Sequence, residues 1–544
     1  MRRLAHISDT GCADSTRFAR GRKVAVEDRR WDGGAMTRLL GLLGGLSLTM
    51  DMGTGAPLEE SLRRCVVAVR LARASGCTDD EVHDVLYAAL LEHLGCTAYT
   101  SELAKVFGDD IQTIRAGFLA NPADKGELLR VFVPHVARAT GRSKARVMAS
   151  ALASGRAVDT VGPRATCEVA RDSATRLGLS NAVRDALANV TAMWDGSGYP
   201  SARGDDIPLP IRLVHVASVA TSYALLTGPD EGVEAVRRRA GTHLDPGLVE
   251  AFSIDLLDDI ADLDAHQTVL DLEPDPVRRV DASDLERVAR VFGDLADLKS
   301  PWLLGHSAGV AELAGAAAEC RGLGEETAEQ LRLAGHLHDV GRVGVSSRIW
   351  DKRGPLSATE RAQVELHPWH TEQILARAPD LAPVARIAAH HHERLDGSGY
   401  HRGVPAAQQP GEVRLLAAAD RYRSLVESRP HRAALDPDRA RAELEADARA
   451  GRLDADAVAA VLEAAGHRRA ARRPRPAGLT ERQVVVLRLV AAGRTNRQIA
   501  DELSLSPRTV EHHVQDVYAR IGVSTRAGAA MFAMEHGLLD AKPG

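Results

Sequence analysis

The sequence is poor in aromatic residues and has no long hydrophobic run. Phe, Trp and Tyr make up 3% of its 544 residues, whereas 44% of the residues are hydrophobic, so its cores must be packed from small aliphatic side chains. This composition is typical of a mostly helical protein. The most apolar early segment, residues 36–50, is short, contains glycines and carries Arg38. It therefore predicts neither a transmembrane helix nor a signal peptide.

Cysteines are few, and no two of them form a CxxC pair. The six cysteines are Cys12, Cys65, Cys77, Cys96, Cys167 and Cys320. Their spacing argues against a disulfide framework and against a zinc knuckle, and it favours a reducing cytoplasm with no membrane partner. The net charge is −5, so any affinity for nucleic acid must come from a local surface.

Changes in composition and periodicity divide the chain into six segments. We expect a disordered tail at 1–35, with Met36 as an alternative start, and an acidic connector at 241–280. Helical periodicity predicts domains at 36–240 and 281–435, then a helix and basic linker at 436–477 and a domain at 478–544. The predicted fold class is all-α, with two helical bundles followed by a four-helix domain.

A His-Asp pair, His338-Asp339, lies near the end of a helical run at 327–339. Imidazole nitrogen suits a transition metal, and a carboxylate can bridge two metals. Chance adjacency explains the other such pair, His83-Asp84. His338-Asp339 is different because other candidate metal ligands precede and follow it along the chain: His306, His367, His391, His392 and Asp420.

These residues, together with the loop sequence DGSGY at 396–400, resemble the HD-GYP subgroup of the HD metal-dependent phosphohydrolases over about residues 301–432. The resemblance implies one metal held by His306, His338, Asp339 and Asp420. Asp339 would bridge to a second metal, held by His367, His391 and His392. The implied cofactors are two divalent transition metals, iron or manganese. Trp302 stands where some members have a Glu for a third metal, so we expect a dinuclear site.

The same resemblance implies catalytic and substrate-binding residues. Asp339 and Arg342 are the catalytic candidates, with Arg342 in place of the family lysine as a cation that could reach phosphate. The implied substrate contacts are Tyr400, Arg429 and Arg432. His401 replaces the proline of the GYP motif. The ligand is therefore expected to be a cyclic dinucleotide or another phosphoester. We expect His336 and His390 to be bystanders, whereas His370 could substitute for His367.

The sequence DGSGYP at 195–200 indicates a second, degenerate copy of this domain. Placing His93 on His338 puts Ser61 on His306 and Leu94 on Asp339. Placing Asp195 on Asp396 then puts Thr166 on His367, and Val190 and Thr191 on His391 and His392. Further along the chain, Ser218 falls on Asp420. We expect this copy to bind no metal and to serve structure and dimerisation, with ligand sensing as the alternative. Its extra length falls around residues 99–163.

The C-terminal segment resembles the LuxR-type helix-turn-helix domain over residues 479–539. Thr480 is the predicted N-cap of its first helix, and Ser506-Pro507 opens its third helix. Exposed N-terminal residues of that helix would enter the major groove, and nearby arginines would hold phosphates. The candidate contacts to double-stranded DNA are Arg497, Arg508, Thr509, Glu511, His512, Gln515, Arg520 and Arg526. We expect a homodimer on paired half-sites.

We therefore predict a DNA-binding transcriptional regulator that carries a dinuclear-metal phosphohydrolase or nucleotide-sensing module. One alternative is a metal-dependent cyclic di-GMP phosphodiesterase whose DNA-binding domain only localises it. A second alternative is a catalytically inactive nucleotide sensor.

Overall fold

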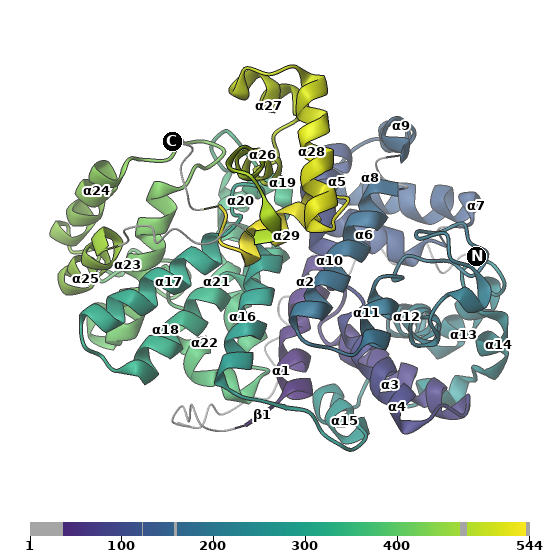
Figure 1. The fold of residues 1–544 in the computed structure, drawn as a ribbon. Helices are drawn as coiled ribbons and strands as arrows, with labels where there is room; N and C mark the ends of the chain where they lie inside the picture. The colour runs from purple at the N-terminus through teal and green to yellow at the C-terminus, as the bar shows by residue number, and fades with distance from the viewer. Residues whose placement is uncertain (1–35, 122, 157–159, 468–475, 540–544) are drawn as a thin grey trace.

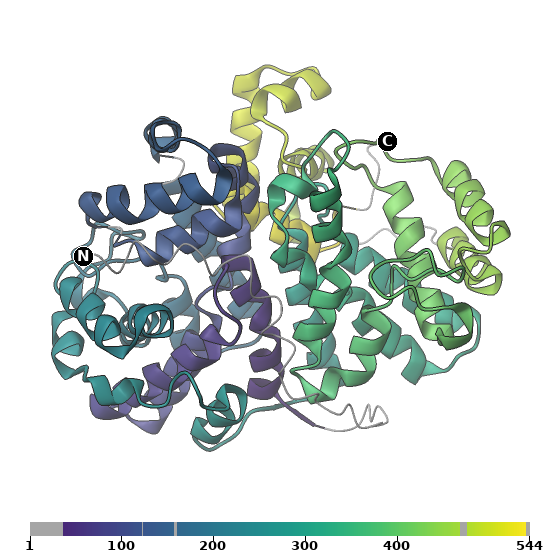
Figure 2. The ribbon, with the colours of Figure 1, turned by 180° about the vertical axis from the view of Figure 1, so that it is seen from behind.

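A computed structural model describes residues 36–121, 123–156, 160–467 and 476–539. The described part is almost entirely helical, which confirms the predicted fold class. Within it, strands β1 (Thr37–Arg38) and β2 (Arg279–Val280) pair antiparallel, with Thr37 opposite Val280. The expected tail at 1–35 and most of the expected basic linker lie outside the described residues. Two helical halves lie side by side, and the C-terminal domain rests over their junction (Figures 1 and 2).

The first module holds helices α1 to α13, and the connector adds α14 and α15. Their bounds are α1 Leu39–Leu46, α2 Leu48–Thr54, α3 Glu60–Ala74, α4 Asp79–Leu91, α5 Thr100–Phe107, α6 Asp110–Leu119, α7 Lys125–Glu127, α8 Val133–Thr140, α9 Lys144–Arg156, α10 Gly162–Arg176, α11 Asn181–Leu187, α12 Leu209–Thr227, α13 Pro229–Arg238, α14 Pro246–Ala251 and α15 Ala265–Leu272. The acidic run at 255–264 of the connector is exposed, as a solvated face requires, whereas Asp245 and Glu273 are buried.

The second module holds helices α16 to α25, and the C-terminal domain holds α26 to α29. Their bounds are α16 Ala282–Asp297, α17 His306–Cys320, α18 Glu325–Leu337, α19 Ser347–Trp350, α20 Ala358–Glu365, α21 His367–Leu375, α22 Ala382–Ala388, α23 Gly411–Val426, α24 Pro437–Arg449, α25 Ala455–His467, α26 Glu481–Ala491, α27 Asn496–Leu503, α28 Pro507–Ile521 and α29 Arg526–Glu535. Helices α24 and α25 pack against α17 and α23, so they complete the second module.

The two modules repeat the same helices, but in a register one residue away from the one that the sequence suggested. Helices α3 and α17 each have 15 residues, and each follows a residue in the left-handed conformation, Glu59 (φ 68°) or Gly305 (φ 77°). Helices α4 and α18 each have 13 residues. Glu60 therefore stands at the position of His306, and Glu92 and His93 stand at those of His338 and Asp339. Matching like residues, His93 with His338, was wrong.

In the later part of the repeat the two loops correspond as predicted, and the connection from loop to helix is one residue longer in the second module. In the first DGSGY loop, Asp195 Oδ1 accepts the backbone N–H of Ser197 at 2.8 Å, and in the second Asp396 Oδ1 accepts that of Ser398 at 3.0 Å. Both α12 and α23 begin after a proline N-cap. Ser218 on α12 is therefore the counterpart of Asp420 on α23.

Helix α12 is long and apolar enough to cross a bilayer by length and composition, and 61% of its apolar window is buried inside the molecule. Its place in the repeat accounts for this character. Like α23, it forms the central helix of its module, and it packs against α3, α4 and α13.

The extra length of the first module forms helices α5 to α9, and α6 ties the two modules together. Asp110 at the start of α6 is fully buried. Its carboxylate accepts hydrogen bonds from Ser346 Oγ at 2.7 Å and from Ser347 N at 2.8 Å, and it pairs with the buried Lys299. A second buried pair, Arg176–Asp294 at 2.6 Å, also crosses the junction. Because these charges are satisfied only by the other module, the junction is a fixed interface.

The C-terminal domain contacts both modules through α29 and the residues next to it. Glu168 on α10 of the first module accepts hydrogen bonds from Ser524 N at 2.9 Å and Thr525 Oγ1 at 2.6 Å. Arg290 on α16 of the second module donates to the carbonyl oxygens of Met534 and Glu535, at the C-terminal end of α29, at 2.9 and 2.7 Å. Helices α27 and α28 project away from the two modules (Figure 1).

Candidate metal centre and DNA-binding surface

The candidate metal ligands come from helix ends that converge on α23. His306 is the first residue of α17, and His367 is the first residue of α21. His338 and Asp339 follow the last residue of α18. Helix α22 ends at Ala388. His391 and His392 therefore lie in the turn after α22 rather than on the helix.

One group of ligands gathers around one oxygen of Asp339. Its Oδ2 lies 2.8 Å from Nε2 of His338 and 3.5 Å from Nε2 of His306. Asp420 Oδ1 lies 3.1 Å from Nε2 of the same His306 and 3.9 Å from that of His338. His306, His338 and Asp339 are fully buried, and Asp420 is nearly so. The four residues expected to share one metal are thus together.

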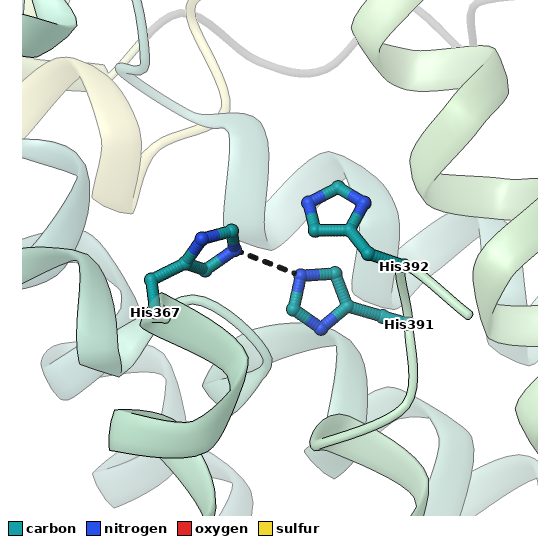
Figure 3. Close-up of side chains that lie close together, drawn as sticks. All are labelled: His367, His391 and His392. Atoms are coloured by element: carbon teal, nitrogen blue, oxygen red, sulfur yellow. Dashed lines mark hydrogen bonds between the residues drawn. The ribbon is translucent and has the colours of Figure 1, made fainter. Parts of the chain in front are cut away.

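The second group gathers around the other oxygen. Asp339 Oδ1 lies 3.2 Å from Nε2 of His367 and 3.4 Å from Nε2 of His391. Figure 3 shows that the rings of His367, His391 and His392 converge, and the Nε2 atoms of His367 and His391 are 3.2 Å apart. Of the two alternatives considered for this position, His367 and not His370 joins the cluster. The carboxylate of Asp339 lies between the two groups.

Backbone carbonyls fix the orientation of three imidazoles. Nδ1 of His338 donates to Gly335 O at 2.8 Å, Nδ1 of His367 to Val364 O at 2.5 Å, and Nδ1 of His391 to Ala388 O at 2.6 Å. A carbonyl only accepts, so each Nδ1 must carry the proton in its neutral ring. Each Nε2 then presents a lone pair to the site, as a metal-binding histidine requires.

The electrostatics of the site favour ionised carboxylates. Burial opposes the ionisation of Asp339, but the charges of Arg342 and His338 hold its pKa well below the usual range. Burial acts on Asp420 in the same sense, and the hydrogen bond with His306 and the charge of His392 hold its pKa well below the usual range. Burial lowers the pKa of His367 to about 4, so this ligand is neutral at pH 7.

The arrangement fits two cations. His306, His338 and Asp339 form one group, and His367, His391 and His392 form another, with the candidate donor atoms of each group within 4.8 Å of one another. In the described residues, His338 Nε2 and both oxygens of Asp339 are buried without a hydrogen-bond partner. The facing lone pairs of His367 and His391 repel unless a positive charge lies between them. Both features are accounted for by metal binding.

The expected catalytic and substrate-binding residues differ in whether they face the candidate metal ligands or are bonded elsewhere in the chain. Arg342 Nη1 lies 2.7 Å from Asp339 Oδ2, and its guanidinium stacks 5.3 Å over Trp350. Tyr400 lies 4.5 Å from His392, ring centre to ring centre, at the edge of a cavity of about 210 Å³. Arg429 donates to Trp302 O at 2.5 Å, and Arg432 donates to Leu425 O at 2.9 Å. The two arginines are thus bonded within the chain.

Two supporting residues were missed by the sequence analysis. Glu427 accepts a hydrogen bond from His306 Nδ1 at 2.8 Å and so orients this ligand. Thr371 Oγ1 donates to His338 O at 2.8 Å and accepts from Gly341 N at 3.1 Å. Thr371 lies one helical turn after His367, so its spacing could have shown it; Glu427 lies beyond α23, and only the fold brings it to the site.

At the equivalent place, the first module holds an internal ionic network instead. Arg64 is fully buried and lies 3.0 Å from Glu92 and 3.0 Å from Nε2 of His93. Arg115, from α6, pairs with Glu60 at 3.1 Å. Burial, together with both guanidinium groups, holds the pKa of His93 well below the usual range. Two arginines therefore occupy the space between the residues that correspond to His306, His338 and Asp339.

The helix-turn-helix residues form the predicted elements. Thr480, Thr495 and Ser506 cap α26, α27 and α28, and Pro507 opens α28. Arg526 donates to Arg494 O at 2.6 Å and to Asn496 Oδ1 at 3.1 Å, so it ties the start of α29 to the connection between α26 and α27. The other expected DNA contacts are exposed: Arg497, Arg508, Thr509, Glu511, His512, Gln515 and Arg520.

Comparisons with known proteins agree with this organisation. The family described as HD domain matches residues 290–457, and the luxR family of bacterial regulatory proteins matches residues 477–533. The chain is 29% identical over 405 residues to the 3'3'-cGAMP-specific phosphodiesterase 3 of Vibrio cholerae serotype O1, covering 72% of this chain and 87% of that protein. It is 33% identical over 150 residues to a cyclic di-GMP phosphodiesterase of Thermotoga maritima, covering 27% of this chain and 41% of that protein.

A solved structure shows a similar fold over both modules. The crystal structure of a cyclic GMP-AMP-specific phosphodiesterase of Vibrio cholerae is 26% identical, with a TM-score of 0.54, and the match covers 80% of this chain and 99% of that chain. The chain therefore joins an HD-domain region, homologous to metal-dependent phosphodiesterases of cyclic dinucleotides, to a C-terminal DNA-binding domain of the luxR family of bacterial regulatory proteins.

Proposed function

We propose that the second module is a dinuclear, metal-dependent phosphodiesterase of cyclic dinucleotides, and that it controls a transcriptional regulator in the cytoplasm. The observation that carries this proposal is the position of Asp339. One of its oxygens lies 2.8 Å from His338 and the other 3.2 Å from His367, so a single carboxylate faces both groups of ligands. The relatives named as cyclic-dinucleotide phosphodiesterases supply the substrate class.

The donor set favours iron or manganese, because imidazole nitrogens outnumber carboxylates. Two such ions, when bound, supply charge for the phosphoryl oxygens and lower the pKa of a water between them. The chain provides the rest of the site. Carbonyl-anchored histidines hold the donor atoms in place, Asp339 bridges the two positions, and Tyr400 forms a wall of the adjoining cavity.

A catalytically inactive sensor is the second candidate, and Arg342 is the observation that favours it. Its Nη1 lies 2.7 Å from Asp339 Oδ2. A guanidinium so close to the bridging carboxylate competes with a metal for the same negative charge. In this case the module would bind a nucleotide and pass its effect to the DNA-binding domain without hydrolysis.

Metal content and turnover distinguish these functions. The full chain would be purified anaerobically, its metals quantified, and the same sample incubated with cyclic di-GMP and with 3'3'-cGAMP. About two iron or manganese ions per chain together with turnover would support the phosphodiesterase. Metal with nucleotide binding but no turnover would support the sensor, and a chain without metal affinity would contradict the dinuclear site.

For the DNA-binding domain, we propose that α28 enters the major groove of double-stranded DNA as part of a homodimer. The exposed residues Arg508, His512 and Gln515 lie on its outer face. Two such helices on one dimer would contact half-sites about one helical turn apart. Footprinting on selected DNA sequences, with the mass of the complex measured in solution, tests the dimer and the half-site spacing together.

A further inference from the structure

The cavity beside the metal ligands has a cationic wall that the sequence analysis did not predict. The cavity is lined by His392 and Asp420 and also by Arg394, Arg421 and Ser424. Arg394 lies in the turn before the DGSGY loop, and Arg421 lies on α23 directly after Asp420. The two arginines therefore border the same space as two candidate metal ligands.

Both cations are placed by the surrounding structure. Nε of Arg421 donates to Asp447 Oδ2 at 2.9 Å, and Arg452 holds the other oxygen of Asp447 at 2.6 Å. Arg394 Nη1 is buried and has no hydrogen-bond partner in the described residues. A buried donor without a partner is costly, and it indicates a position prepared for an anionic ligand.

The first module shows that the fold does not require these arginines. The two DGSGY loops share the same hydrogen bonds, and the helices after them share the same start. Counted from the two loops, Met193 stands at the position of Arg394; counted from the proline N-caps Pro208 and Pro410, Val219 stands at that of Arg421. The cations are thus present in the module that has metal ligands and replaced by apolar residues in the module that has a salt-bridge network.

The arginines expected to hold phosphate, Arg429 and Arg432, do not line this cavity. Arg429 is paired with Glu427 at 2.9 Å, and Arg432 donates to the carbonyls of Leu425 and Ala433. A cyclic dinucleotide carries two phosphodiester groups, and only one of them can lie at the metal positions. The other needs a cation at a distance from the metals, and arginine is suited to phosphate because of its planar set of donors.

We propose that Arg394 and Arg421 bind the phosphate that is not cleaved, and that they select substrates with two phosphates over simple phosphodiesters. This inference rests on the proposed phosphodiesterase function. Ser424, on the same face of α23 and also at the cavity, adds a hydroxyl donor. Selectivity for a dinucleotide then comes from residues outside the metal centre.

The test compares two substrates in the full, metal-containing chain. Cyclic di-GMP has two phosphates, whereas bis(p-nitrophenyl) phosphate has one and can be cleaved at the metals without reaching the cationic wall. We expect Arg421→Met to raise KM for cyclic di-GMP at least about tenfold, equivalent to roughly 1.4 kcal/mol of binding. Hydrolysis of bis(p-nitrophenyl) phosphate should stay within about twofold. Arg421→Lys should recover part of the loss, because it keeps the charge.

A matched control is Arg441→Met, since Arg441 is exposed on α24 and does not line the cavity. Equal loss on both substrates, or no loss on either, would overturn the inference while leaving the phosphodiesterase in place. If the chain cleaves neither substrate, calorimetric binding of cyclic di-GMP replaces KM as the readout, and equal affinity of Arg421→Met and the unaltered chain overturns the inference. A chain that neither binds nor cleaves a dinucleotide removes the proposed function and this inference together.

Discussion

Where the second module has His306, His338 and Asp339, the first module has Glu60, Glu92 and His93. The surrounding helices have the same lengths, and the central helices α12 and α23 start in the same way. In the first module, Arg64 and Arg115 neutralise the buried carboxylates at 3.0 and 3.1 Å. In the second module, the oxygens of Asp339 lack hydrogen-bond partners in the described residues, and Arg342 alone approaches as a fixed cation.

The comparison shows what this place in the fold demands. Buried carboxylates must have a positive partner, because an uncompensated charge in the interior is costly. In the first module, an arginine of α3 or of the inserted α6 neutralises the carboxylates permanently. A bound metal would neutralise them reversibly and could also activate a water or a phosphate group. Under the proposed function, the two modules therefore differ in the source of the cation that neutralises these carboxylates.

The largest effect is expected from Asp339→Asn, which removes the bridging charge from the second module. Metal content should fall below one ion per chain and dinucleotide hydrolysis should fall more than about 100-fold, since changes to groups that only support metal ligands already cost 10–100-fold. Elemental analysis and turnover on the same sample measure both. His93→Asn, at the equivalent position of the first module, is the control and should keep metal and turnover; a similar loss there would mean that the first module also serves the metal centre.

The next effect is on stability, and it concerns the first module. Arg64→Met leaves Glu92 buried without its partner, so we expect the free energy of unfolding of this module to fall by about 3–5 kcal/mol. Denaturant unfolding and calorimetry would each measure the change in stability. The metal content of the chain should stay unaltered. Adding Glu92→Gln should restore part of the stability because it removes the unpaired charge. If Arg64→Met instead bound an additional metal, Arg64 would be blocking a site rather than replacing one.

A smaller effect on stability is expected from changes in the DGSGY loop, which both modules share, and a change in turnover is expected in the second module alone. A side chain at Gly198 would come within 3.0 Å of the backbone of Thr191 and Met193, and one at Gly399 within 3.0 Å of the backbone of His392 and Arg394. Each glycine-to-alanine change should lower the stability of its module by about 1–3 kcal/mol. Only Gly399→Ala should also lower turnover, because it displaces the backbone of His392. Equal loss of turnover in Gly198→Ala would contradict this division.

The sequence was sufficient for the fold class and for bringing the candidate ligands together. Local signals in the sequence made this possible. The capping residues Thr480 and Ser506 predicted helix starts, and the order of the histidines along the chain indicated one site. The register of the first helices was not predictable in this way, because Glu60 and Glu92 are not the same residue types as His306 and His338. Arg394 and Arg421 were missed because the cavity that they line exists only after the loop folds against α23.

The smallest effect concerns the link from each module to the DNA-binding domain. Glu168→Ala removes the acceptor on the first module, and Arg290→Met removes the donor on the second. Among the described residues, the candidate metal ligands gather in the second module. The segment before His306 also reaches the DNA-binding domain, since Pro301 lies against Gly493 and Gly305 against Leu539. We therefore expect Arg290→Met to abolish a change of DNA affinity on adding cyclic di-GMP, and Glu168→Ala to shift the basal affinity only about two- to fivefold, the size of a weak coupling free energy. Both affinities would be measured by fluorescence anisotropy at fixed salt.

The opposite result would be that Glu168→Ala abolishes the response and Arg290→Met keeps it. The signal would then pass through the first module, and the salt-bridge network around Arg64 would take part in transmitting it rather than replace a metal.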